Sequence, residues 1–293
     1  MTGGMLGSTT VRIAPRGPFS LAQASRFFRG WSAESAVDGM LPLAMVADDL
    51  ASVAGVAVRA DRDSVVCEIT GTADPERVAA QISRIFSLDH DATGFVAVGA
   101  KDAVLGERIA AAPGLRPVLF HSPYEAGIWA ILSQRVSVRQ ASALRARLGD
   151  AIGQRIVVAG VERAVLPTPA ALLAASELPS GIPAVKAERL RALAEAALTG
   201  RLDAARLRAL SNDAAREELL ELPGIGPFSA DLILMRSTGV TDAFSVKEPR
   251  VRAAISTAYG VPNEDSNIEQ VAERWRPWRT WAGVLFRATE SLT

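Results

Sequence analysis

The sequence predicts an α+β protein in two parts: residues 1–110 contain strands and helices, and residues 111–293 are all helical. Every segment with the period-two alternation that we assign to a strand comes before about residue 110. Beyond it, apolar residues recur at helical spacing, and polar cap residues mark several helix starts. The length of 293 residues and a composition of 49% hydrophobic and 22% charged residues indicate a globular protein of two or three domains.

The first part contains strands that we expect to pair and helices that we expect to cover them. "TTVRIAP" alternates as a strand does, and "RADRD" is a turn between two further strands. "DPERVAAQISRIFSL" is amphipathic, with Asp74 as its cap and Pro75 in its first turn. The expected elements are strands at 9–15, 52–61 and 64–71 and helices at about 19–29 and 74–88.

The second part contains a series of capped helices. Ser122 precedes Pro123, and Glu125 completes a capping box. "SVRQASALRARLGDAIG" repeats this pattern with its own Ser and Gln. Further helices are expected from Thr168-Pro169, over 182–200 with a stop at Gly200, over 211–222, and from Pro227 to the C-terminus with interruptions.

Composition argues against several classes of protein. Cys67 is the only cysteine, so there is no disulfide framework and no thiolate-ligated cluster. His90 and His121 are the only histidines, which makes a zinc site improbable. There is no signal-peptide pattern and no apolar run of membrane-spanning length. We therefore expect a cytoplasmic protein that needs no metal or other cofactor.

Local charge differs from the formal net charge of zero. Residues 126–149 contain four arginines and no acidic residue. Such a stretch is either a solvated helix face or a surface for an anionic partner, and charge alone does not decide between them.

The segment "LPGIGPFSA" places a glycine-rich turn between two apolar helices. Gly224 and Gly226 permit a positive φ and the close approach of a ligand. Pro227 fixes the first turn of the following helix, whose free amides then point outward. Such a nest binds anions, above all phosphate, although an ordinary helix-helix turn is the alternative.

At this point the chain resembles a known family. "LLELPGIGPFSADLI" is similar to the helix-hairpin-helix motif of DNA base-excision glycosylases. "SPYEAGIWAILSQRVSV", "GIPAVKAERLRALAEAAL" and "AERWRPWRTWA" resemble segments of its bacterial 3-methyladenine DNA glycosylase II (AlkA-like) branch. The resemblance implies an N-terminal antiparallel sheet with helices, then a helical body with a central cleft to which the helix at 19–29 contributes. It also implies that the hairpin holds a DNA backbone, with room for a monovalent cation, through Leu222, Gly224, Gly226 and Ser229.

Two other branches of the superfamily fit less well. The branch with an iron–sulfur cluster needs four cysteines, and this chain has one. The branch that cuts the strand uses a lysine on the hairpin helix, where this chain has Phe228. The resemblance therefore implies a monofunctional enzyme in which water is the nucleophile.

Glu248 is the candidate catalytic residue. "DAFSVKEPRVR" resembles the segment "D-x-F-P-x-x-D" of the family, with Ser245 in place of the proline and Glu248 at the catalytic aspartate. One carboxylate can stabilise the positive charge that builds on the sugar when the base departs. A glutamate keeps that charge on a side chain about 1.5 Å longer. A surface salt bridge is the alternative role.

The resemblance also implies residues for the base pocket and for the wedge that fills the space of the flipped base. The pocket positions are Phe27, Phe228, Leu232, Pro249, Trp281 and Arg287. Trp281 is open to a second interpretation as a core residue. Arg287 replaces a stacking tryptophan and would repel a cationic base, and we expect it to pair with Glu248. The wedge positions are Gln134 and Arg135, with a solvated arginine as the alternative.

These features together imply a monofunctional DNA glycosylase, a hydrolase of base excision repair. It would bind double-stranded DNA that contains a damaged or modified base, flip that base and hydrolyse its N-glycosidic bond. A catalytically weak or inactive protein that binds DNA damage through the same fold is the alternative. A helical protein that makes protein contacts through the same turn is a third reading. We expect a monomer, cytoplasmic and nucleoid-associated, without a membrane partner.

Overall fold

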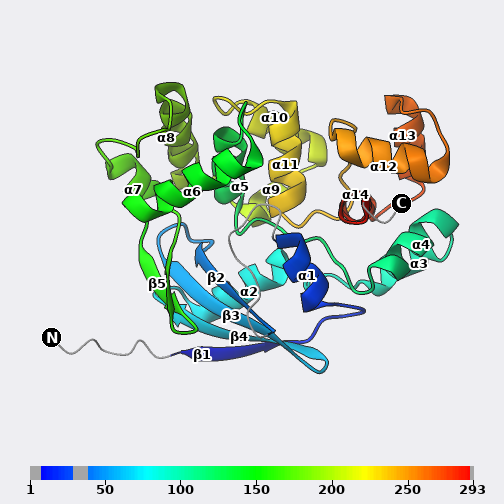
Figure 1. Ribbon diagram of the computed structural model, residues 1–293, viewed down its shortest axis with the longest axis horizontal. Helices are drawn as coiled ribbons and strands as arrows, with labels where there is room; N and C mark the ends of the chain where they lie inside the picture. Colours follow the sequence, from blue (N-terminus) through cyan, green and yellow to red (C-terminus); the bar gives the residue numbers. More distant parts are fainter. Residues whose placement is uncertain (1–7, 29–38, 291–293) are drawn as a thin grey trace.

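The computed structural model describes residues 8–28 and 39–290, and it divides into a sheet and a group of helices above it (Figure 1). The sheet has four antiparallel strands in the order β1-β4-β3-β2. They are β1 (Thr9–Ile13), β2 (Met40–Val46), β3 (Val53–Asp61) and β4 (Ser64–Gly71). The first, third and fourth were expected from their alternation, and the turn between β3 and β4 passes through Arg62 at a φ of 50°.

The sequence did not reveal β2 because both of its faces are buried. Leu41, Leu43 and Met45 face a core that includes residues of α2 (Pro75–Ile85). Ala44 and Val46 face a hairpin of two further strands, β5 (Arg155–Val158) and β6 (Val161–Ala164). A strand covered on both sides is a continuous apolar run, which periodicity cannot distinguish from a helix.

The hairpin β5–β6 corrects the expectation that everything beyond residue 110 is helical. Ile156 and Val158 are buried against the sheet while Arg155 and Val157 are exposed, as alternation requires. The turn uses Ala159 and Gly160, both at positive φ. Two strands from the otherwise helical second part therefore cover the face of β2 that carries Ala44 and Val46.

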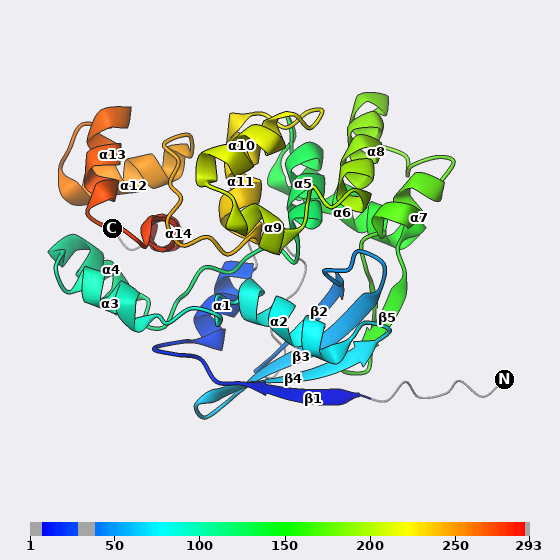
Figure 2. The same ribbon diagram turned by 180° about the vertical axis from the view of Figure 1, so that it is seen from behind.

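The helices form two further cores, and their caps largely match the sequence pattern. One core surrounds α5 (Pro123–Leu132), whose ten residues are all buried. The other core joins α3 (Thr93–Gly99) and α4 (Ala103–Ala111) to α12 (Pro249–Tyr259), α13 (Asp265–Glu273) and α14 (Arg279–Ala288). The helices of the two cores lie side by side in both views (Figures 1 and 2). Asp74, Ser122, Ser137 and Thr168 accept backbone N–H groups as helix caps. The remaining helices are α1 (Leu21–Phe28), α6 (Val138–Ile152), α7 (Pro169–Ala174), α8 (Ala184–Leu198), α9 (Ala204–Ala209), α10 (Asn212–Leu220) and α11 (Pro227–Ser237).

Glu125 departs from its predicted role in a capping box. Ser122 does cap α5, since its hydroxyl accepts the N–H of Glu125. The carboxylate of Glu125 instead binds His121 at 2.8 Å and Arg145 at 2.5 Å. The ring of His121, four residues earlier, and the guanidinium of Arg145, on α6, together attract the carboxylate more strongly than a single backbone N–H does.

Candidate functional site

The hairpin Leu222–Gly226 joins α10 to α11, and its two glycines serve different purposes. Leu222 and Ile225 are buried in the core and anchor the loop. Gly224 has a φ of +82°, and a Cβ there would lie 2.3 Å from Cδ of Arg189. Gly226 has a φ of −98° and a ψ of 180°, and a Cβ there would meet nothing within 4 Å.

The sequence permits a positive φ at both glycines. Only Gly224 of the two adopts one; the backbone of Gly226 is open to any residue. Gly226 is the N-cap of α11 and supplies no side chain to cap it. The first-turn amides, near half-buried Ser229, are thus presented for an external acceptor at a helix N-terminus.

Next to the hairpin lies the insertion turn, which we define as Ser133–Val136, between α5 and α6. Gln134 donates from Nε2 to the carbonyl of Gly224 at 2.7 Å and accepts at Oε1 from Nη1 of Arg189 at 2.7 Å. Arg135 is exposed at a φ of +56°, and no ion pair holds its guanidinium within the described residues. The structure thus brings both predicted wedge residues beside the hairpin, with the side chain of Gln134 bound inward.

Glu248 is the N-cap of α12. Its Oε2 accepts the N–H of Val251 at 2.6 Å, and the side chain is half-buried. Pro249 follows it as the first residue of the helix and is exposed. A carboxylate immediately before a proline is a common helix start, so the sequence contained the signal for this cap.

The segment that carries Glu248 is fixed to two helices. The hydroxyl of Ser245 donates to the buried carboxylate of Asp231, on α11, which also binds Nε of Arg216 at 2.7 Å. The N–H and the carbonyl of Ala243 both bind Oγ1 of Thr280, on α14, at 2.9 and 2.8 Å. The sequence analysis missed these supporting residues; Ser245, at the position of the family's proline, was the available signal.

Arg287 does not pair with Glu248, contrary to expectation. Its Nη1 lies 2.8 Å from Oε2 of Glu290, three residues further along the chain, and its side chain is 35% exposed. A partner on the same stretch of chain satisfies the guanidinium without any long-range contact. Burial, together with the charge of Arg287, lowers the pKa of Arg236 to about 10, so two positive charges lie close together here.

The remaining pocket positions have different environments. Phe228 is 49% exposed beside the hairpin, and Leu232 is half-buried against the core around α5. Trp281 is 2% exposed and packs on Phe95 with ring centroids 5.5 Å apart, which fits its second interpretation as a core residue. The backbone of Phe27 belongs to α1, but its side chain lies outside the described residues.

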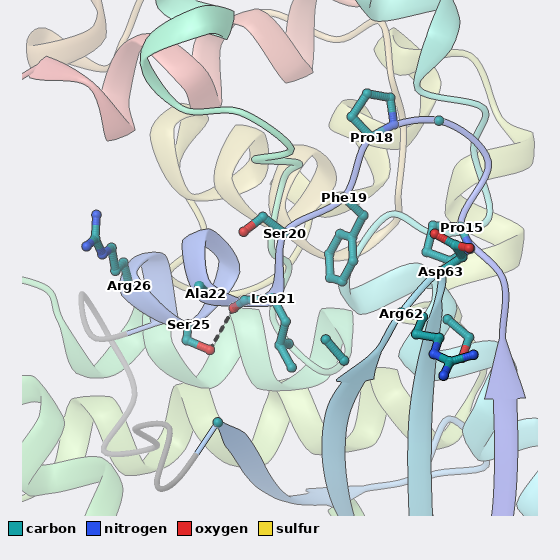
Figure 3. Close-up of a pocket in the computed structure, with 14 residues that line it drawn as sticks. Pro15, Pro18, Phe19, Ser20, Leu21, Ala22, Ser25, Arg26, Arg62 and Asp63 are labelled. Atoms are coloured by element: carbon teal, nitrogen blue, oxygen red, sulfur yellow. Dashed lines mark hydrogen bonds between the residues drawn. The ribbon is translucent and has the colours of Figure 1, made fainter.

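A cavity of about 710 Å³ lies apart from these residues, between the segment leading into α1 and the turn of β3 and β4 (Figure 3). Phe19, Ser20 and Arg26 line one side, and Arg62 and Asp63 line the other. None of the predicted site residues is among the described residues that line it.

The described residues contain neither a cluster of metal ligands nor a membrane-spanning helix. No group of three or more His, Cys, Asp or Glu side chains in residues 8–28 and 39–290 is placed to hold a metal ion. In the same ranges, no helix has both the length and the apolar character of a membrane span.

Comparison with known proteins identifies relatives of the chain. The chain is 33% identical over 216 residues to the DNA-3-methyladenine glycosylase 2 of Escherichia coli, which covers 72% of this chain and 71% of the relative. It is 32% identical over 209 residues to a probable bifunctional transcriptional activator/DNA repair enzyme AlkA of Mycobacterium tuberculosis, which covers 69% of this chain but 40% of that relative. No family model matches.

Solved structures share the fold. A 3-methyladenine DNA glycosylase from Archaeoglobus fulgidus superposes with a TM-score of 0.80 at 21% identity, over 96% of this chain and 98% of that one. An 8-oxoguanine glycosylase/lyase of Clostridium acetobutylicum, in complex with double-stranded DNA, superposes with a TM-score of 0.72 at 18% identity over the full length of both chains. The predicted fold class is confirmed. The chain belongs to the family of DNA-3-methyladenine glycosylase II, the AlkA-like branch of the helix-hairpin-helix DNA glycosylases.

Proposed function

We propose that the chain is a monofunctional DNA glycosylase that binds damaged double-stranded DNA, flips the modified base and hydrolyses its N-glycosidic bond. The observation that carries the proposal is the attachment of Glu248 to the hairpin helix. Ser245, three residues before Glu248, is hydrogen-bonded to Asp231, five residues after Gly226. A phosphate bound at the hairpin and a sugar beside Glu248 would therefore be held at a fixed distance from each other.

The first step is binding of the DNA backbone. The backbone N–H groups at the start of α11 donate hydrogen bonds to a phosphate oxygen, with the positive end of the helix dipole directed at it. Arg135 enters the duplex where the flipped base was, because its guanidinium is exposed and free to stack on bases. Phosphate contacts supply affinity without sequence preference.

The second step is cleavage of the bond between the base nitrogen and C1′. The bonding electrons leave with the base, and the carboxylate of Glu248 stabilises the positive charge that forms on the sugar. Water adds its oxygen to C1′ and loses one proton; a base that was neutral in the duplex leaves as an anion and takes up a proton, whereas a cationic base leaves neutral and the proton goes to solvent. Phe228 occupies the position of the lysine that the strand-cutting branch of the superfamily uses, so no Schiff base forms there and the strand stays intact.

Glu248→Gln tests the role of the carboxylate without removing the cap, because the amide oxygen of glutamine can still accept the N–H of Val251. We expect base release in single-turnover assays to fall by about 10²–10³-fold, as when an electrostatic stabiliser is removed. Affinity for a duplex with an abasic-site analogue should stay within about twofold, a free-energy change of about 0.4 kcal/mol.

The matched control is Asp203→Asn, which changes another carboxylate cap, at the start of α9. It should leave base release unchanged. Equal release by wild type and Glu248→Gln would remove Glu248 from the reaction.

The second candidate is a damage-binding protein without catalysis. The cap geometry favours it, since one oxygen of Glu248 is already engaged by Val251. In this case wild type binds the abasic-site duplex tightly but releases no base from any lesion.

A further inference from the structure

Gln134 links two segments that lie far apart in the sequence. Its Nε2 donates to the carbonyl of Gly224, and its Oε1 accepts from Arg189, each at 2.7 Å. The chemistry fixes the orientation of the amide, because a carbonyl needs the NH₂ group and a guanidinium needs the oxygen. A side chain bound at both ends is not available to fill a space in a duplex.

Arg189 also braces the hairpin directly. Its Cδ lies 2.3 Å from the position that a Cβ on Gly224 would take, so the arginine packs against the glycine backbone. The same side chain thus touches the hairpin and binds the amide of the insertion turn. Its own helix, α8, is part of the core around α5.

Arg135, the neighbour of Gln134, has a constrained backbone. A φ of +56° is uncommon for a residue other than glycine and persists where the surroundings impose it. Lys186, also on α8, supplies part of that constraint: its Nζ donates to the carbonyls of Leu132 at 2.7 Å and Gln134 at 2.9 Å. The insertion turn is therefore held by two side chains of α8 and by the hairpin, while the guanidinium of Arg135 stays exposed.

We propose that Gln134 and Arg189 form a strut that fixes the distance between the hairpin and Arg135. Gln134 is then a positioning residue, and Arg135 alone is the wedge. The inference rests on the proposed binding of damaged DNA. The strut sets where Arg135 enters the duplex relative to the phosphate at the hairpin, and a wedge displaced by about 1 Å loses much of its effect.

The test compares Gln134→Met and Arg189→Met with Arg191→Met. Arg191 lies two residues further along α8, and its Nη2 donates to the carbonyl of Ala175 at 2.7 Å, so it is a matched control. The readout is the ratio of dissociation constants for intact duplex and for duplex with an abasic-site analogue. We expect the ratio to fall about tenfold in the first two variants and to stay unchanged in the control.

A double-mutant cycle separates positioning from general stability. In an Arg135→Ala background, Gln134→Met should lower the ratio no further, because the strut acts through Arg135. Gln134→Glu is the variant to measure if Gln134→Met does not fold. Its carboxylate still accepts from Arg189 but cannot donate to the carbonyl of Gly224, so it should also lower the ratio.

Two results overturn the inference: an unchanged ratio in folded Gln134 variants, or additive losses in the cycle. If wild type binds intact duplex and abasic-site duplex equally well, the proposed function itself is contradicted, and the role of the strut is contradicted with it.

Discussion

At the scale of single residues, the two hairpin glycines show how the same residue type can be required for different reasons. Gly224 is fixed by the protein itself, through a φ of +82° and the contact with Arg189. Gly226 has an ordinary φ and open space where its Cβ would lie. Among residues 8–28 and 39–290 no atom would meet a Cβ at position 226, so we expect the requirement for glycine there to come from a ligand that approaches closely.

Gly226→Ala should therefore leave stability unchanged and weaken binding to every duplex, damaged or not, by about tenfold or about 1.4 kcal/mol. Gly224→Ala should instead destabilise the protein by at least about 1–2 kcal/mol through its left-handed backbone. Thermal unfolding and fluorescence anisotropy with labelled duplex measure the two effects. Full DNA affinity in a folded Gly226→Ala protein would contradict phosphate binding at the hairpin.

The residues around Glu248 show which parts of a site the sequence could predict. The positions of the hairpin, of Arg135 and of Glu248 follow from motifs that are continuous in sequence. The pairing of Glu248 with Arg287 was wrong because a long-range pair depends on how helices pack, whereas the observed partners, Val251 and Glu290, each lie three residues away. Pairs of residues three apart in sequence form without any tertiary contact, so Glu248 and Arg287 each bind a local partner in place of one another.

At the scale of secondary-structure elements, the cap residues predicted where helices start, whereas the sequence pattern did not predict the strand that is buried on both faces. Ser137 and Gln140 form the full capping box that the sequence indicated. The strand β2 was missed because the core with α2 buries one of its faces and the hairpin β5–β6 buries the other. The hairpin β5–β6 was missed because its alternation is only four residues long in each strand. Tertiary packing decides such segments, so sequence pattern alone does not.

The cluster of Glu125, His121 and Arg145 joins α5 to its neighbours and gives stability a dependence on pH. Burial would raise the pKa of Glu125, but the charges and hydrogen bonds of His121 and Arg145 outweigh it and lower the pKa from 4.5 to about 2. A lowered folded-state pKa stabilises the protein above the unfolded value, and that stability is lost as pH falls from about 4.5 through about 2.

Glu125→Gln should remove this contribution, on the order of 3 kcal/mol at pH 6, since one pKa unit corresponds to about 1.4 kcal/mol. It should also flatten the fall in unfolding free energy between pH 4.5 and 2, measured by urea denaturation. Glu218→Gln is the control, because the exposed pair of Glu218 and Arg206 contributes about 1 kcal/mol or less. Identical pH profiles for wild type and Glu125→Gln would refute the assignment.

At the scale of the whole molecule, the candidate site lies where two cores meet. α11 carries the hairpin and belongs to the core around α5, whereas α12 and α14 belong to the core that includes α3 and α4. The segment with Ser245 and Glu248 crosses between them. The division at residue 110 stays a prediction, although α3 and α4, which precede it, pack with helices that follow it.

The charges at this junction bear on the choice of lesion. Arg236 and Arg287 lie close together, with Glu290 as the acid paired to Arg287. The resemblance to the family implies a stacking tryptophan at position 287, where this chain has an arginine. We propose that the flipped base lies beside these two arginines, where a cationic alkylated base would be repelled and would lack a tryptophan to stack on. We therefore expect weak release of 3-methyladenine and 7-methylguanine and stronger release of a neutral lesion, and Arg287→Trp should raise alkylpurine release.

The central claim is tested most directly by measuring free base released from duplexes that carry a panel of cationic and neutral lesions. The account predicts release of at least one neutral lesion by wild type, an intact strand until alkali cleaves the abasic product, and loss of release in Glu248→Gln. Strand cleavage without alkali would contradict the monofunctional mechanism. No release from any lesion by a protein that still binds the abasic-site duplex would contradict catalysis altogether and leave a damage-binding protein.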